Sequence, residues 1–282
     1  MGKFLRIIIT VFICIGFGNL TLAAEKLQVM ASIYPMAEFC RGVGGDLVDV
    51  YQMVPNGIEP HDYEPSPKDL VKLGNMRVFV YNGGVEFWAT PALQALQEKE
   101  IISVQTGEGI GEKDPHVWVS PRGAIQQVKK ICEVFCQADS QNTAQYKLNT
   151  ERYLSELSKL DEQYSNLAKQ YRRRTFVTAH AAFGHLAKDY ALQMVPVAGL
   201  SPEAEPTPQD LQKVLQLVKK YQVRYIFFET LTSPKLAELV AKETGAKTAV
   251  LDPLEGVAET DKVTYLELQK RNLEALKREF AE

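Results

Sequence analysis

The feature that most constrains this sequence is a regular alternation of short apolar, β-branched runs with longer segments that carry a helical repeat. Strands that alternate with helices predict mainly parallel sheets covered by helices. The alternation occurs in two sets of four. The expected strands are 27–33, 48–54, 77–81 and 101–104 in the first set, and 175–179, 193–197, 224–229 and 247–251 in the second. We therefore expect an α/β protein with two lobes, each built on a four-stranded, mainly parallel sheet.

Helical patterns separate and follow these runs. The expected helices lie near 34–44, 67–74, 92–99, 121–136, 181–190, 208–221, 234–244 and 260–280. Between the two sets, apolar residues repeat at spacings of three and four from Tyr153 to Tyr171, and no Gly or Pro occurs from about 140 to 173. This predicts one rigid helix of about 50 Å that joins the lobes. A partner-binding coiled coil is the alternative, although the stripe lasts fewer than four heptads.

The expected division of the chain is a leader at 1–24, a first lobe at 25–138, the linking helix at 139–174 and a second lobe at 175–282. In the leader, Lys3 and Arg6 precede an apolar run that is too short to span a bilayer, and small residues end at Ala24. This pattern is typical of a secretory signal peptide. We expect a protein secreted across the cytoplasmic membrane that is periplasmic or associated with the cell envelope. Ile13 is too bulky for a lipid-attachment motif at Cys14.

Composition and cysteine count exclude several classes of protein. Hydrophobic residues make up 45% and charged residues 24%, as in ordinary globular proteins, and the formal net charge is −3. Without a basic excess, nucleic-acid binding is not expected. After the leader only Cys40, Cys132 and Cys136 remain, and an odd number does not build a disulfide framework. Pairing of Cys40 with one of the other two, or three unpaired core thiols, both stay open.

Three of the four histidines follow expected strands. His61 and His116 lie after the second and fourth strands of the first lobe, and His180 follows the first strand of the second lobe. Asp252 follows the last strand. Ligands bind at the carboxyl ends of parallel strands, so these four residues could converge between the lobes. Three imidazoles and one carboxylate suit Zn²⁺, with Mn²⁺ or Fe²⁺ as alternatives. His185 is expected at the surface.

Several motifs resemble a known family along essentially the whole chain after the leader. They are residues 53–67 (MVPNGIEPHDYEPSP), 81–88 (YNGGVEFW), 114–118 (DPHVW), 178–184 (TAHAAFG), 199–208 (GLSPEAEPTP) and 251–254 (LDPL). In this order they are similar to the motifs of the zinc/manganese-type solute-binding proteins of bacterial metal ABC transporters. The segment 199–208 resembles one seen mainly in zinc-type members.

The resemblance implies two lobes joined by a rigid helix, with a metal ion held in the cleft between them. It implies the ligands His61, His116, His180 and Asp252, capture of the ion outside the cytoplasmic membrane, and delivery to a membrane permease. Manganese-type relatives usually have Glu at the third position, so His180 favours Zn²⁺ over Mn²⁺ as the bound cargo. Many zinc-type relatives carry a histidine-rich loop between the first two ligands, which this sequence lacks. We expect a monomer.

The same residues are compatible with two alternative functions. A zinc-dependent hydrolase could use three of these ligands, with Glu59, Glu64 or Glu229 as a general base. The sequence contains no His-Glu-x-x-His motif and no signature of an activated serine or cysteine, which argues against an enzyme. The second alternative is an adhesin or structural protein in which the metal only stabilises the fold. Glu229 is either a hydrogen-bond partner of a histidine ligand or a solvated strand end.

Overall fold

The two expected sheets are both present. The computed structural model describes residues 25–110, 113–203 and 205–281, so the expected signal peptide lies outside the described residues. Each sheet has four strands, and all strand pairs are parallel. The strands are β1 Leu27–Ala31, β2 Val48–Gln52, β3 Val78–Tyr81, β4 Ile102–Gln105, β5 Thr175–Thr178, β6 Gln193–Pro196, β7 Tyr225–Phe228 and β8 Lys247–Val250. The sheet orders are β2-β1-β3-β4 and β6-β5-β7-β8, which confirms the two-lobed α/β prediction.

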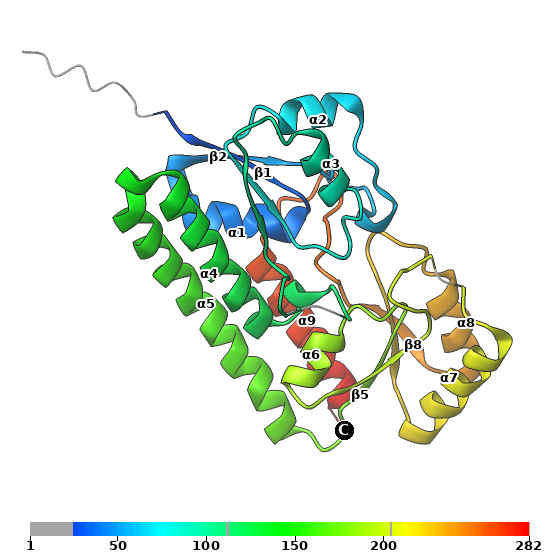
Figure 1. Cartoon of the computed structure of the whole chain (residues 1–282). Helices are drawn as coiled ribbons and strands as arrows, with labels where there is room; N and C mark the ends of the chain where they lie inside the picture. Colours follow the sequence, from blue (N-terminus) through cyan, green and yellow to red (C-terminus); the bar gives the residue numbers. More distant parts are fainter. Residues whose placement is uncertain (1–24, 111–112, 204, 282) are drawn as a thin grey trace, which may run out of the picture.

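Helices cover both faces of each sheet (Figure 1). They are α1 Tyr34–Gly44, α2 Pro67–Leu73, α3 Ala89–Ala95, α4 Pro121–Ala138, α5 Thr143–Gln170, α6 Gly184–Asp189, α7 Pro208–Tyr221, α8 Lys235–Thr244 and α9 Tyr265–Phe280. The period-2 alternation of strands assigns the faces. In β3, Val78 and Val80 belong to the main core, whereas Phe79 packs in a separate cluster under α2 and α3. In β7, Phe227 joins the main core and Ile226 packs under α7 and α8.

The long helix expected between the lobes is α5, which packs along α4 and also contacts α1 and α9. Its 28 residues extend about 42 Å, somewhat less than expected. It ends at Gln170, before the run Arg172–Arg173–Arg174. Arg173 instead donates to the carbonyl of Gln222 in the second lobe. The exact lobe boundaries stay a prediction.

One continuous core connects the lobes. The main buried cluster contains Trp118 from the first lobe, Tyr164 from α5 and Phe176 from the second lobe. The segment after β8 runs back toward the first lobe, where Val263 O accepts a hydrogen bond from Tyr34 Oη at 2.8 Å. The expected last helix, 260–280, begins only at Tyr265, because Thr264 and Glu267 form a capping box there. Among the described residues, no helix is both long and apolar enough to cross a membrane.

Candidate metal centre

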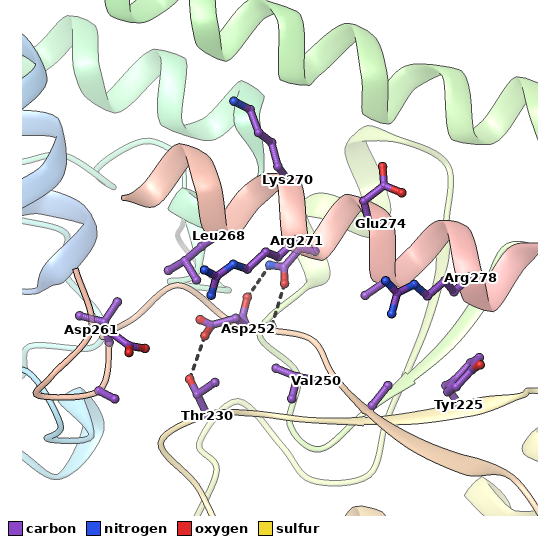
Figure 2. A pocket seen from close by; sticks show the side chains of 15 residues that line it. Tyr225, Thr230, Val250, Asp252, Asp261, Leu268, Lys270, Arg271, Glu274 and Arg278 are labelled. Atoms are coloured by element: carbon purple, nitrogen blue, oxygen red, sulfur yellow. Dashed lines mark hydrogen bonds between the residues drawn. The ribbon is translucent and has the colours of Figure 1, made fainter. Parts of the chain in front are cut away.

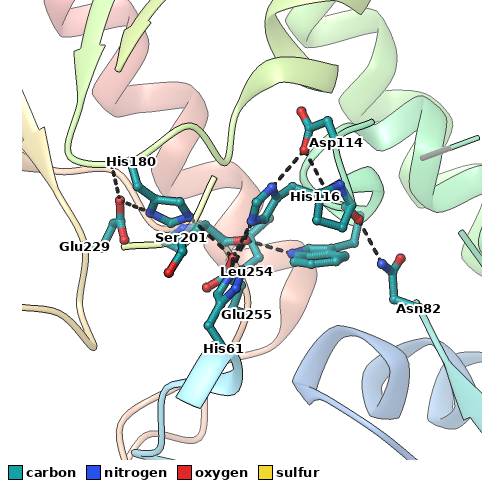
Figure 3. Close-up of polar contacts among 12 residues, drawn as sticks. His61, Asn82, Asp114, His116, His180, Ser201, Glu229, Leu254 and Glu255 are labelled. Carbon is teal, nitrogen blue, oxygen red and sulfur yellow. Dashed lines mark hydrogen bonds and ion pairs between the residues drawn. The ribbon is translucent and has the colours of Figure 1, made fainter. Parts of the chain in front are cut away.

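Three histidines and one glutamate meet where the two lobes face each other (Figure 3). His61 and His116 come from loops after β2 and β4, and His180 and Glu255 come from loops after β5 and β8. One potential ligand atom from each of the four side chains lies within 4.8 Å of all the others. Carboxyl ends of parallel strands thus supply every member of the group, as the sheet topology predicts.

Glu255 stands at the centre of this group. Its Oε1 lies 3.1 Å from His116 Nε2, 3.5 Å from His61 Nε2 and 3.7 Å from His180 Nε2. Its side chain is 2% exposed, and its carboxylate oxygens have no partner among the described residues other than these imidazole nitrogens. Burial by itself would raise the pKa of Glu255, but the three imidazoles hold it well below its usual range. A buried carboxylate needs a positive partner, which protonated imidazoles or a metal ion can supply.

The outer nitrogens of two imidazoles are held by carboxylates. His180 Nδ1 lies 2.7 Å from Glu229 Oε1, and His116 Nδ1 lies 2.8 Å from Asp114 Oδ1. A carboxylate at Nδ1 fixes the ring orientation and the tautomer, so Nε2 is left to coordinate a metal ion. Glu229 therefore is a partner of His180 and not a solvated strand end.

These contacts also raise the pKa values of the two imidazoles. Burial favours neutral His180, but Glu229 and Glu255 outweigh it and raise the pKa of His180 to about 10. In the same way burial is outweighed at His116, where Asp114 and Glu255 raise its pKa. Without a metal ion, the site therefore holds protons on imidazoles that face a charged carboxylate. A divalent cation can replace that positive charge when the protons leave.

Local backbone structure presents the first two ligands. His61 lies in a single 3₁₀ turn, Pro60–Asp62, where Pro60 sets the backbone and Glu59 accepts from the amide of His61 at 3.3 Å. Burial, followed by the charge of Glu255, raises the pKa of Glu59 to about 8. His116 precedes the 3₁₀ turn Val117–Val119, and its amide donates to Asp114 Oδ1 at 3.0 Å. Asp114 thus fixes both the backbone and the ring of His116.

The loop that carries Glu255 is fixed by contacts between lobes. Trp118, fully buried after His116, donates from Nε1 to Pro253 O at 2.8 Å. Leu254 has φ of 63°, a left-handed conformation that is unusual for a branched residue. This residue turns the chain between Asp252 and Glu255, so that the two carboxylates have different surroundings.

Asp252, which the sequence analysis expected as the fourth ligand, lies outside the group of four. Its Oδ1 accepts from the amide of Leu254 at 2.7 Å, and its Oδ2 accepts from Thr230 Oγ1 at 2.8 Å. The side chain of Asn272, in α9, accepts a hydrogen bond from the amide of Asp252 and donates one to its carbonyl oxygen. Asp252 borders a pocket of about 690 Å³ against α9. Figure 2 shows the side chains that line it. Its carboxylate therefore organises the loop, and Glu255 takes the place expected for Asp252 in the group.

The other residues named from the sequence have simpler surroundings. His185 is half-buried and its Nε2 lies 2.8 Å from Asp114 O, so it supports the His116 loop rather than facing solvent. Glu64 is exposed. Cys40, Cys132 and Cys136 are all unpaired thiols. Sequence reasoning missed Glu255, although it lies only three residues after Asp252 on the same loop.

A two-lobed α/β fold whose lobes share a closed set of nitrogen and oxygen ligands defines a solute-binding protein for a metal ion. The chain belongs to the family described as zinc-uptake complex component A, periplasmic, or ZnuA, which it matches over residues 29–279. This confirms the expected resemblance. The family is a transport component and not an enzyme, so the hydrolase alternative is not supported.

Individual relatives agree with this assignment. The chain is 38% identical over 285 residues to the high-affinity zinc uptake system protein ZnuA of Bacillus subtilis (strain 168), covering 92% of this chain and 89% of the relative. It is 34% identical over 290 residues to the zinc-binding protein AdcA of Streptococcus pyogenes serotype M1, covering 91% of this chain but only 56% of that relative. The Zn(II)-bound ZnuA-like domain of Streptococcus pneumoniae AdcA superimposes with a TM-score of 0.81 at 37% identity, covering 92% of this chain and 100% of that structure.

Proposed function

We propose that this protein binds Zn²⁺ outside the cytoplasmic membrane and delivers it to the permease of an ABC transporter for import. The ligands would be His61, His116, His180 and Glu255. The observation that carries the proposal is the buried Glu255 carboxylate, which faces three imidazole Nε2 atoms at 3.1–3.7 Å and has no other partner among the described residues. Such a group is costly to bury unless it binds a cation. Membership of the zinc-uptake family supports the same reading.

The donor set favours Zn²⁺ over Mn²⁺. Three imidazole nitrogens and one carboxylate oxygen suit a borderline ion, whereas Mn²⁺ prefers sites richer in oxygen. The relatives named above are described as zinc proteins, which supports the same choice. The alternative is that the protein is a manganese- or iron-binding member of the family. A metal competition experiment distinguishes the two.

The geometry suits a carrier. Four protein ligands complete a tetrahedral shell around zinc, and catalytic zinc sites usually leave one position for water. Since both lobes of one chain supply ligands, a single copy can hold the ion, and we propose that the protein works as a monomer. Release needs the ligands of the two lobes to separate. The long α5 and the Trp118–Pro253 hydrogen bond favour a small displacement of the Glu255 loop over a wide hinge opening.

The test is a competitive titration of the metal-free protein with Zn²⁺ and Mn²⁺ against a chromophoric chelator. We expect one tightly bound Zn²⁺ per chain and much weaker Mn²⁺. Glu255→Gln keeps the shape of the side chain but removes the charge, and should weaken Zn²⁺ binding more than 100-fold. The matched control is Asp252→Asn, which retains an acceptor for the Leu254 amide and should lose less than tenfold. The reverse order of the two variants would assign the fourth ligand to Asp252, and tight Mn²⁺ with weak Zn²⁺ would overturn the choice of metal.

A further inference from the structure

Two cysteines outside the zinc site lie together on α4. Cys132 Sγ and Cys136 Sγ are 4.0 Å apart, and both thiols are unpaired. Cys132 is 8% exposed and Cys136 is half-buried, so the pair reaches the surface on one side. None of the contacts that organise the zinc ligands involves this pair.

A helix prevents these two residues from forming a disulfide with each other. Side chains four residues apart on a helix have Cβ atoms about 5–6 Å apart. A disulfide requires a Cβ separation of about 3.5–4.5 Å. Because Cys132 and Cys136 lie within one regular helix, closing the bond would require α4 to unwind. The pair therefore stays as two adjacent thiols.

The same separation suits two sulfurs bound to one metal ion. With metal–sulfur bonds of about 2.3 Å, two thiolates lie about 3.8 Å apart on a tetrahedral ion and about 4.6 Å apart on a linear one. The observed 4.0 Å lies between these limits. A metal ion can thus bridge the two sulfurs without movement of the backbone.

The surroundings can stabilise the thiolates that a metal would create. Burial and the adjacent Cys136 thiol raise the pKa of the Cys132 thiol, and the Thr150 hydroxyl and the Lys147 ammonium partly offset this. Thr150 Oγ1 is buried and has no hydrogen-bond partner among the described residues, so it is free to donate to a sulfur. Cys136 Sγ lies 4.0 Å from Thr143 O, at the first residue of α5, so its S–H donates to that carbonyl as long as the thiol is protonated.

We propose that Cys132 and Cys136 form a second metal site, specific for a soft monovalent ion, Cu⁺ or its analogue Ag⁺. Thiolates select soft ions, and two thiolates are sufficient for a closed-shell monovalent ion. In the binding step Cu⁺ forms two Cu–S bonds while both thiols lose their protons to solvent. The product carries one negative charge, which the positive charge of Lys147 partly offsets. Zn²⁺ would need two further ligands and is therefore disfavoured at this pair.

The experiment titrates the reduced, zinc-loaded full chain with Cu⁺ under anaerobic conditions. Ultraviolet thiolate-to-copper absorption and metal analysis follow the binding. We expect one Cu⁺ per chain in addition to the zinc. Cys132→Ser and Cys136→Ser should each lose it, whereas the matched control Cys40→Ser should keep it. Unchanged Cu⁺ binding in the first two variants, or release of one zinc for each Cu⁺ bound, would overturn the proposal.

Two further measurements separate this site from the zinc site and from misfolding. His180→Ala should lose Zn²⁺ but keep Cu⁺, so a failure of the zinc proposal leaves the test of the cysteine pair intact. In the unmodified protein, Cu⁺ or Ag⁺ should protect Cys132 and Cys136 from alkylation, as read by peptide mass spectrometry. This readout needs no variant. Alkylation of both thiols at the same rate with and without the ion would refute the site.

Discussion

The clearest quantitative consequence of the structure is the pH dependence of zinc affinity. Glu229 and Glu255 outweigh the effect of burial and raise the pKa of His180 to about 10. At pH 7 the metal-free protein would then carry a proton on His180 that zinc must displace. The neutral form is about one part in 10³, which corresponds to about 4 kcal/mol of lost binding free energy.

The size of the change in zinc affinity with pH distinguishes this site from one whose histidines have an ordinary pKa. A histidine with a pKa of about 6.5 would weaken zinc binding only about fourfold between pH 8 and pH 6. A histidine with a pKa of about 10 is below its pKa over this whole range, so it weakens binding about tenfold per pH unit, or about 100-fold in total. The raised pKa of His116 acts in the same direction. Affinity should therefore rise steadily with pH and not level off near 7.

The assay is chelator competition at pH 6, 7 and 8, with the chelator's own protonation corrected at each pH. Glu229→Gln is the matched control, since it keeps a hydrogen-bond acceptor at His180 Nδ1 but removes the charge. It should flatten the pH dependence, because without the charge of Glu229 the pKa of His180 falls and fewer protons compete with zinc. A decrease of less than tenfold between pH 8 and pH 6 in the unmodified protein would refute the reasoning.

Three other outcomes follow from the fold. Trp118→Phe removes the hydrogen bond to Pro253 O and should destabilise the protein by about 1–3 kcal/mol and speed zinc release, measured by urea unfolding and by stopped-flow chelation. Gly123→Ala would place a Cβ 2.1 Å from Val117 O, so it should cost at least about 1–3 kcal/mol and reduce soluble yield, even though Ala has the higher helix propensity. Removing zinc should leave the protein folded by circular dichroism, and zinc at 100 times Kd should add about 2.7 kcal/mol, raising Tm by roughly 5–10 °C. Unfolding on zinc removal would instead indicate a structural site.

The sequence predicted the elements well because its local patterns agree with the fold. The expected strand at 193–197 is β6, Gln193–Pro196, and the expected helix at 208–221 is α7 with the same bounds. Short apolar runs that alternate with helices can bury their side chains in few arrangements other than a parallel sheet. The differences lie at helix ends, where caps decide the boundary. Thr264 is the N-cap of α9, so the helix begins at Tyr265, five residues later than the apolar pattern suggested.

The positions of the three histidines followed from topology in the same way. Each comes directly after a strand or in the loop that follows one, so the carboxyl edges of two parallel sheets bring them together. Their partners did not follow from the sequence. Glu229 was equally compatible with a solvated strand end, and only the structure places its Oε1 2.7 Å from His180 Nδ1.

By itself the sequence determined the fold class, the two sets of strands, the long α5 and the three histidine positions, because periodicity and strand ends are local properties. The tertiary structure alone decided which acid faces the histidines. Asp252 and Glu255 lie three residues apart on one loop, and the left-handed turn at Leu254 gives their carboxylates different surroundings. That turn is held by Thr230, Asn272 and Trp118, which come from three distant parts of the chain. The direction of a side chain in such a loop depends on long-range contacts that no local pattern contains.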